Sequence, residues 1–282
     1  MKTSAPTSAS GADSLPPAGP QSWRQTLPLI GPQSALFLDF DGTLVELAAQ
    51  PEAVLLSPDL IPVLAQLAVR LSGALAIVSG RPLTELDNFL APLRLPVAAE
   101  HGAQQRLVSG EVVKLAAPDL QEVAQRVTAL AQRHPGLRAE IKSAAIALHY
   151  RHAPGLEALA LQAMTEAAGS TPQLELLRGK YVFEIKPAGI SKGSAIEAFM
   201  TAPPFAGRLP LFAGDDVTDE AGFSAVQQLG GHGIKVGEGA TLANYRCATP
   251  AAMLQWLQAA GHEQAFASAS SETEKNRGGI NT

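Results

Sequence analysis

The sequence of 282 residues has one cysteine, few aromatic side chains and no long apolar run. The single Cys247 excludes an internal disulfide framework and fits a reducing compartment, so we expect a cytoplasmic protein. No stretch approaches the roughly 18 uninterrupted apolar residues of a membrane-spanning helix. The N-terminal segment also lacks the apolar run of a secretory signal, so we expect no export.

Charged residues are also scarce, at 17% of the chain, and the formal net charge is −5. No stripe of Lys and Arg interleaved with aromatic residues is present, which excludes a typical nucleic-acid partner. Basic residues are in slight excess within 105–186, and acidic residues dominate elsewhere. This balance suits an anionic small molecule at the middle segment and a cation held by the remainder. We expect a monomer.

Apolar residues are plentiful by contrast, at 46% of the chain, so most of it should fold around a normal core. The length exceeds that of one ordinary core and favours a large domain with a smaller one. Segments 1–22 and 263–282 are rich in Ser, Gly, Pro and polar residues, and we expect them to be disordered tails.

Strands and helices alternate in the first part of the chain. The run ALFLD at 35–39 is typical of a strand buried on both faces of a parallel sheet. A helix follows from Ser57 as N-cap, with leucines at helical spacing. The pattern then predicts a strand at 74–78, a helix at 82–91 and a strand at 97–99. This order predicts a doubly wound, Rossmann-like α/β fold.

The alternation breaks after residue 104 and resumes near 187. Between these points, strands joined by short turns predict a small antiparallel sheet with two helices. The expected elements are a hairpin at 107–114, helices at 118–134 and 155–168, and strands at 137–142, 145–151, 174–178 and 181–186. We therefore expect an α+β cap at 105–186, inserted in a catalytic core formed by 23–104 and 187–262.

Two aspartates two positions apart follow the first strand, in LFLDFDGTLVE. The carboxylate of Asp39 should point out of the carboxyl edge of the sheet, where doubly wound folds bind ligands. Asp41 can face the same cavity. Gly42 permits a tight backbone, and Thr43 offers a hydroxyl and an N–H to phosphate oxygens.

Further polar groups follow other apolar strands or begin helices. In AGDDVTDE, Asp215 and Asp216 supply the oxygen ligands that Mg²⁺ prefers. Lys192 of SKG lies at a helix start, and Ser79 of SGR ends a strand, so both can bind phosphate. Since an aspartate and a phosphate dianion repel each other, a nucleophilic Asp39 would need these positive groups and a cation.

Taken alone, each of these motifs has an ordinary structural explanation. Asp219 and Glu220 fit first-turn carboxylates of a helix as well as functional groups. His101 follows a strand end, where a histidine lining the site and a hydrogen-bonded loop histidine are both possible. Arg81 of SGR is a candidate substrate contact, although SGR alone marks only a strand-to-helix turn. The shared order of the motifs along the chain favours a joint site.

In that order, DxDGT, Ser79, Lys192 and GDDVTD resemble the four motifs of the haloacid dehalogenase superfamily. The resemblance implies a phosphatase with Asp39 as the nucleophile that forms an aspartyl-phosphate. Asp41 would protonate the leaving alcohol and then activate water, while Ser79 and Lys192 would bind phosphate. It also implies Mg²⁺ held by Asp39, the backbone carbonyl of Asp41 and Asp215, with Asp216 as an auxiliary carboxylate.

A narrower resemblance extends over about 35–260. The strings AEHGA, EIKSAAIALHYR, VFEIKPAGISKG and GDDVTDE are similar to those of bacterial trehalose-6-phosphate phosphatases. That family implies that Glu140, Lys142 and Glu184 of the cap hold sugar hydroxyls. Alternation puts Glu140 and Lys142 on one face of a strand. From the residues alone, a solvated sheet face explains the same pattern.

The resulting hypothesis is hydrolysis of trehalose 6-phosphate, a small-molecule sugar phosphate. Related phosphatases of sucrose phosphate or mannosyl-phosphoglycerate share the core motifs, and the cap strings distinguish them. A non-catalytic sugar-phosphate sensor would be expected to lack Asp39 or Asp41, and both are present. A phosphotransferase or mutase remains an alternative, because an aspartyl-phosphate can pass its phosphoryl group to an alcohol.

Overall fold

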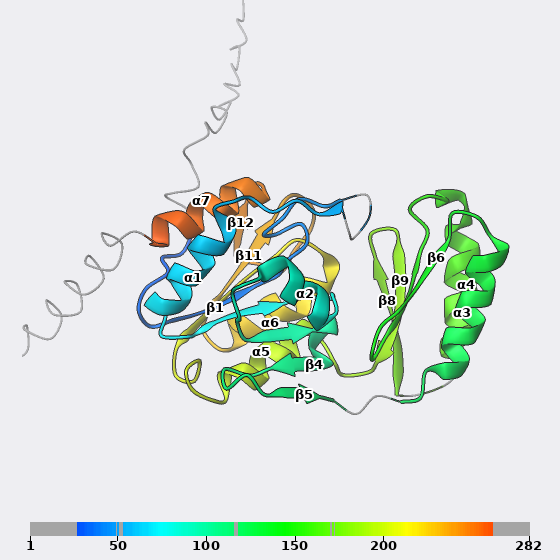
Figure 1. Cartoon of the computed structure of the whole chain (residues 1–282), viewed down its shortest axis with the longest axis horizontal. Helices are drawn as coiled ribbons and strands as arrows, with labels where there is room; N and C mark the ends of the chain where they lie inside the picture. Colours follow the sequence, from blue (N-terminus) through cyan, green and yellow to red (C-terminus); the bar gives the residue numbers. More distant parts are fainter. Residues whose placement is uncertain are drawn as a thin grey trace, which may run out of the picture.

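The computed structural model describes residues 27–48, 50, 53–115, 118–169, 171 and 173–261. Its core is an eight-stranded sheet with the order β12-β11-β10-β1-β2-β3-β4-β5 (Figure 1). The first six strands in that order are parallel, and β4 and β5 are antiparallel. The strands are β1 (Ser34–Leu38), β2 (Leu75–Val78), β3 (Val97–Ala99), β4 (Gln104–Arg106), β5 (Val112–Lys114), β10 (Leu209–Gly214), β11 (His232–Val236) and β12 (Tyr245–Cys247).

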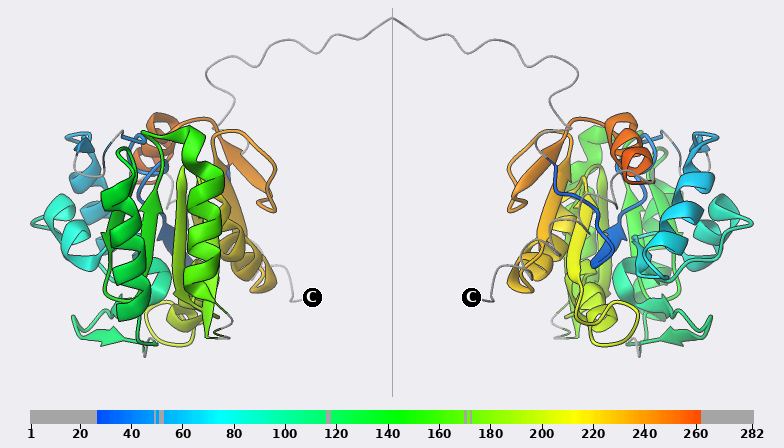
Figure 2. Two further views of the ribbon diagram at one scale, coloured as in Figure 1. Left: turned by 90° about the vertical axis from the view of Figure 1, so that its right-hand side faces the viewer. Right: turned by 90° about the vertical axis from the view of Figure 1, so that its left-hand side faces the viewer.

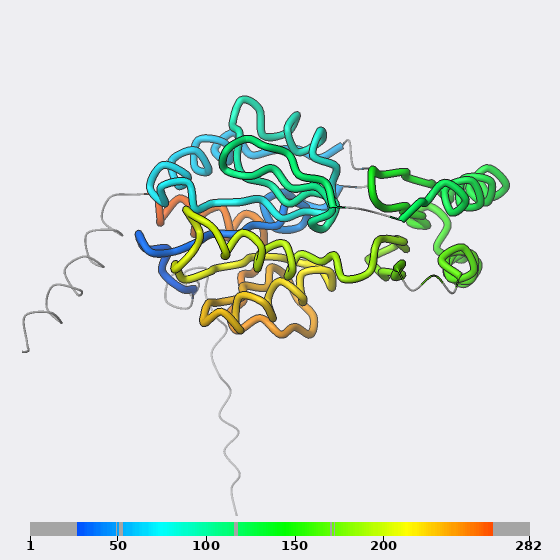
Figure 3. The backbone as a smooth tube through the Cα atoms, turned by 90° about the horizontal axis from the view of Figure 1, so that it is seen from below, coloured from blue at the N-terminus to red at the C-terminus, as the bar shows by residue number. Residues whose placement is uncertain are grey.

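Helices cover both faces of this sheet. The connections β1-α1-β2 and β10-α6-β11 leave the centre in opposite directions, so right-handed crossovers place α1 and α6 on opposite faces (Figure 3). Helix α7 packs on α1, and α5 packs on α6. The helices are α1 (Leu60–Arg70), α2 (Leu83–Leu90), α5 (Lys192–Met200), α6 (Glu220–Gln228) and α7 (Pro250–Gly261). The sequence therefore predicted the doubly wound core correctly.

Strand β1 lies in the middle of the core sheet, and every one of its side chains is buried. Phe37 stacks on Phe205, with ring centroids 5.3 Å apart, and also contacts Phe199. The strand pairs in parallel with β10 on one side and β2 on the other. The carboxyl ends of these three strands therefore meet at one edge, which carries Asp39, Ser79 and Asp215.

The cap is a separate four-stranded antiparallel sheet with the order β6-β7-β9-β8. Helices α3 and α4 cover its outer face, and its inner face is turned toward the core (Figures 1 and 2). Val123, Val127 and Leu130 form the buried stripe of α3 and belong to a hydrophobic cluster of the cap. The elements are α3 (Gln121–Arg133), β6 (Arg138–Ile141), β7 (Ile146–His149), α4 (Glu157–Ala168), β8 (Leu174–Gly179) and β9 (Val182–Pro187).

The expected start of the cap at residue 105 is wrong. The hairpin of β4 and β5, which we expected in the cap, pairs with β3 and extends the core sheet. The two sheets thus divide the described chain into a core of 27–115 and 188–261 and a cap of 118–187. The tails expected at 1–22 and 263–282 lie outside the described residues. Across the described part of the chain, no helix has the length and apolar character needed to cross a bilayer.

Candidate active site

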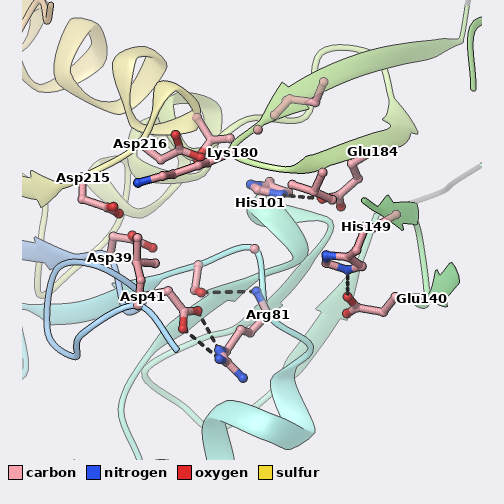
Figure 4. Close-up of a pocket in the computed structure, with 18 of the residues that line it drawn as sticks. Asp39, Asp41, Arg81, His101, Glu140, His149, Lys180, Glu184, Asp215 and Asp216 are labelled. Atoms are coloured by element: carbon pink, nitrogen blue, oxygen red, sulfur yellow. Dashed lines mark hydrogen bonds and ion pairs between the residues drawn. The ribbon is translucent and has the colours of Figure 1, made fainter. Parts of the chain in front are cut away.

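A cavity of about 480 Å³ lies between the carboxyl edge of the core sheet and the inner face of the cap. Figure 4 shows that polar side chains from both domains point into it. Eleven of the twelve site residues expected from the sequence line it: Asp39, Asp41, Ser79, Arg81, His101, Lys192, Asp215 and Asp216 from the core, and Glu140, Lys142 and Glu184 from the cap.

Asp39 directly follows β1, and its side chain is almost fully buried. The Nζ of Lys192, the first residue of α5, donates to Asp39 Oδ1 at 2.7 Å and to Asp219 Oδ1 at 2.7 Å. Burial, together with Asp219 and Asp215, raises the pKa of Asp39 well above its usual value. Burial alone would lower the pKa of Lys192, but Asp219 and Asp39 raise it overall, so the lysine stays charged.

The sequence left Asp219 undecided between a site role and a helix-dipole role. It is fully buried, and its Oδ2 accepts hydrogen bonds from the N–H groups of Asp215 and Asp216 at 3.0 and 2.9 Å. A Cβ at Gly214 would lie 2.3 Å from the Asp219 carboxyl carbon, so this contact requires glycine. Asp219 therefore fixes both the lysine and the loop that carries Asp215.

Three carboxyl groups, those of Asp39, Asp215 and Asp219, place oxygens within 4.8 Å of one another. Both oxygens of Asp219 already accept hydrogen bonds, which leaves Asp39 and Asp215 as the available pair. Burial and Asp219 raise the pKa of Asp215 to about 7. A set of oxygen donors with surplus negative charge matches the preference of a hard divalent cation such as Mg²⁺. The residues present therefore fit a metal site.

Gly42 makes this approach of Asp215 possible. Its φ is +72°, in the left-handed region that favours glycine, and a Cβ there would lie 2.1 Å from Asp215 Oδ2. The glycine of DxDGT is thus needed for the carboxylate pair as well as for the turn.

Arg81 contacts Asp41 in the described structure. Its Nε and Nη2 donate to the two Asp41 oxygens at 2.6 and 2.7 Å, and its Nη1 donates to Glu85 at 2.8 Å. The guanidinium also lies over the rings of Phe40 and Phe89. We expected Arg81 to contact substrate. In this structure it lines the cavity and orients the carboxyl group of Asp41, and the substrate contact stays a prediction.

One expectation for the core is not met in this structure. Thr43 is completely buried and is absent from the described cavity lining, and its N–H donates to the Phe40 carbonyl. Asp216 lines the cavity beside the cluster of Asp39, Asp215 and Asp219, and its role as an auxiliary carboxylate stays a prediction.

The expected cap residues form one charged row. Ala147 of β7 pairs with Glu140 on one side and Glu184 on the other, so these side chains share a face of the sheet. Lys142 Nζ donates to both oxygens of Glu184 at 3.1 Å. Glu140 Oε2 lies 2.8 Å from His149 Nε2.

The cap row is ionised. Burial raises the pKa values of the Glu184 and Glu140 carboxyl groups, but nearby groups outweigh this effect. Lys142 and His101 lower the pKa of Glu184, and His149 and Lys142 lower that of Glu140. The pKa of Lys142 is raised by Glu184 and Glu140 despite burial. His101, whose role the sequence left open, lines the cavity with Nε2 at 3.3 Å from Glu184 Oε2. Its position joins core and cap.

Sequence reasoning missed several basic residues of the lining. Lys180 lies in the β8–β9 turn beside Asp216 (Figure 4). Arg151 and Lys235 also line the cavity. A lysine next to glycine in a hairpin turn resembles a solvated residue, so the sequence carries no signal for Lys180. Only the position of the hairpin against the core reveals it.

Several solved structures share this arrangement of core and cap. A trehalose-6-phosphate phosphatase related protein is 30% identical, with a TM-score of 0.69, and the match covers 80% of this chain and 96% of that one. The C-terminal domain of the Candida albicans trehalose-6-phosphate phosphatase, 22% identical with a TM-score of 0.73, shares the fold over 89% of this chain and 99% of that one. A haloacid dehalogenase-like hydrolase from B. subtilis, with a TM-score of 0.60 over 79% of this chain and 99% of that one, is 14% identical and also shares the fold. The fold is thus that of haloacid dehalogenase-like hydrolases.

Sequence comparison gives the narrower assignment. The family model for trehalose-phosphatase matches residues 37–250. Trehalose-6-phosphate phosphatase of Escherichia coli is 41% identical over 233 residues, which are 82% of this chain and 88% of that protein. A protein of Sinorhizobium fredii named a probable trehalose-phosphate phosphatase is 44% identical over 206 residues, 72% of this chain and 77% of that one. The chain belongs to the trehalose-phosphatase family.

Proposed function

We propose that this protein hydrolyses trehalose 6-phosphate to trehalose and inorganic phosphate through an aspartyl-phosphate on Asp39. The observation that carries the proposal is the shared cavity: a buried aspartate and lysine face an ionised row of the cap across it. The core groups suit a phosphoryl group, and the cap row suits the hydroxyls of a sugar. The substrate named for the E. coli relative is the same.

In the proposed reaction, a carboxylate oxygen of Asp39 forms a bond to phosphorus while the bond from phosphorus to the sugar oxygen breaks. Asp41 gives its proton to that leaving oxygen. Asp41 then takes a proton from water, whose oxygen attacks phosphorus and releases phosphate from Asp39. Since both Asp41 oxygens accept from Arg81 in the structure, the carboxyl group must exchange part of this contact for the substrate. Lys192 and Ser79 bind the phosphoryl oxygens.

The proposed cofactor is Mg²⁺, held by the carboxylates of Asp39 and Asp215 and by the backbone carbonyl of Asp41. Bound there, the ion would supply electrostatic stabilisation of the phosphoryl oxygens. Lys192 orients Asp39, because its ammonium donates to Asp39 while Asp219 holds it in place. Closure of the cap over the sugar would exclude bulk water and strengthen these interactions.

The location and assembly state expected from the sequence stay predictions. A cytoplasmic location is consistent with Cys247, a buried free thiol. A monomer is consistent with a cavity whose lining comes from the core and cap of one chain.

Release of phosphate from a panel of sugar phosphates tests the proposed substrate. We expect the highest kcat/KM with trehalose 6-phosphate, and lower values with sucrose phosphate and mannosyl-phosphoglycerate. Free trehalose and phosphate should appear in equal amounts. A higher kcat/KM with another sugar phosphate would show that trehalose 6-phosphate is the wrong substrate assignment. Transfer of the phosphoryl group to an alcohol would identify a phosphotransferase. Binding without turnover would identify a sensor.

Alanine at Glu140, Lys142 or Glu184 is expected to separate recognition from chemistry. We expect kcat/KM for trehalose 6-phosphate to fall by one to three orders of magnitude, about 1.4–4 kcal/mol, since charge-assisted hydrogen bonds to the sugar are lost. Hydrolysis of p-nitrophenyl phosphate should change little, because this small ester has no sugar hydroxyls and gains nothing from remote binding.

The matched control for these variants is Glu122→Ala, which removes an exposed carboxyl group from the outer helix α3 of the same cap. It should leave both substrates unaffected. Equal losses with both substrates in the three variants would assign these residues to phosphoryl chemistry or folding. Unchanged turnover of trehalose 6-phosphate would show that these three residues belong to a solvated sheet surface without a role in binding.

A further inference from the structure

Glu100 and His101 form an unusual backbone turn between β3 and β4. Their φ values are +49° and +60°, in the left-handed region that residues with a Cβ rarely adopt, and Gly102 follows at +112°. Such conformations persist where surrounding contacts determine them. Here the Glu100 N–H donates to the Arg81 carbonyl at 3.0 Å, and the His101 N–H donates to the Ser79 carbonyl at 2.9 Å. The turn is thereby fixed to the loop that carries Ser79 and Arg81.

The side chain of Glu100 joins the core to the cap. It is 2% exposed and does not belong to the described lining of the cavity. One carboxyl oxygen accepts from the Ser143 hydroxyl at 2.8 Å, and the other accepts from the Ala144 N–H at 2.8 Å. Both donors lie in the turn between β6 and β7. The carboxyl group therefore bonds to the cap, and it does not reach the substrate position.

This turn begins at Lys142, the central cation of the cap row. Lys142 Nζ donates to the Gly80 carbonyl of the core at 3.0 Å as well as to Glu184. Two anchors therefore fix Lys142. The Gly80 carbonyl holds its ammonium, and Glu100 holds the backbone turn through the next two residues, Ser143 and Ala144. Because a shift of about 1 Å is enough to weaken positioned contacts strongly, the second anchor bears directly on where the ammonium lies.

We propose that Glu100 is a positioning residue for sugar recognition, which holds the β6–β7 turn against the core so that Lys142 meets the substrate. The inference rests on the proposed sugar-binding role of Lys142. It explains why a left-handed, buried glutamate follows β3: the strained turn directs its carboxyl group at the cap while the next residue, His101, faces Glu184. The specificity of the cap is therefore set in part by a core residue that touches no substrate.

The test variant is Glu100→Gln, which keeps the size of the side chain and replaces one acceptor oxygen by a donor that opposes Ser143 or Ala144. We expect kcat/KM for trehalose 6-phosphate to fall about tenfold, mainly through KM, and that for p-nitrophenyl phosphate to stay within about twofold. Ser143→Ala removes one of the two contacts from an exposed cap position and should give the same pattern, about threefold. Equal losses with both substrates would assign Glu100 to general folding and overturn the proposal.

A double-mutant cycle with Lys142→Ala decides whether Glu100 acts through Lys142. If it does, Glu100→Gln should cost less than about twofold once Lys142 is already alanine. If the double variant loses kcat/KM by the product of the two single-variant factors, the two residues act independently and the inference is overturned. The two proposals fail differently: Lys142→Ala with full activity on trehalose 6-phosphate would remove the sugar-binding role itself. A harmful Lys142→Ala combined with a harmless Glu100→Gln and Ser143→Ala would remove only the anchoring role.

Discussion

The Asp39→Asn protein is expected to keep its fold and to lose more than about 99% of its turnover. An amide cannot form the acyl-phosphate, and the nearby carboxyl group of Asp41 is held by Arg81. The fold should persist because the amide oxygen can still accept from Lys192, and because removing one of three crowded carboxyl groups relieves repulsion. Phosphate release measures the first expectation, and the thermal unfolding temperature, which should equal or exceed that of the parent, measures the second.

The same chemical change outside the site provides the control. Asp59→Asn alters an exposed carboxyl group at the start of α1 and should leave turnover unchanged. Trapping of the intermediate adds a direct observation: rapid quenching of the parent should give phosphorylated protein, and Asp39→Asn should give none. Residual activity of Asp39→Asn above about one part in a hundred would contradict a nucleophilic role.

Removal of divalent cations with EDTA is expected to reduce phosphate release to background. Mg²⁺ or Mn²⁺ should restore it, since both accept a few carboxylate oxygens. Ca²⁺ should inhibit, because its larger and looser coordination would misplace the nucleophile relative to phosphorus. The reason lies in the cluster of Asp39, Asp215 and Asp219, whose negative charge Lys192 balances only in part.

Stability supplies a second measurement of metal binding that does not depend on turnover. A cation that binds the folded protein alone raises its free energy of unfolding. Mg²⁺ should therefore raise the unfolding temperature of the parent, and Asp215→Asn should reduce the increase, while Asp59→Asn should retain it. Full activity in metal-free buffer, or an equal increase in all three proteins, would refute the assigned site.

The core residues of the site could be predicted because the sequence pattern of each strand and the topology of a parallel sheet lead to the same position. Asp39, Ser79 and Asp215 each follow an apolar strand, and parallel strands end at one edge of the sheet. Lys192 is 153 residues from Asp39, yet its place at a helix start after the inserted cap was enough to bring it to the same edge. Alternation along the strand expected at 137–142 likewise placed Glu140 and Lys142 on one face, and both line the cavity.

The remaining features depend on contacts that no short segment specifies. The hairpin of β4 and β5 has the same local pattern whichever sheet it joins, so its pairing with β3 could not be deduced. Asp219 is one turn from Asp215 in a segment that also suits a helix start, and only Lys192 reveals its role. Thr43 occupies a motif position, yet the fold buries it.

The inserted cap has a consequence for how this enzyme family can diversify. Along the described residues, the chain passes from core to cap after residue 115 and returns to the core after residue 187, and the cap has a hydrophobic cluster of its own. Recombination at these two crossings would exchange the domain proposed to bind the sugar and leave the residues proposed for phosphoryl transfer intact. A new cap would then need to match the core at only a few contacts. Of the contacts at Glu100, the one to the Ala144 N–H is made by backbone, which every residue except proline supplies, so an unrelated cap of the same turn geometry could inherit it.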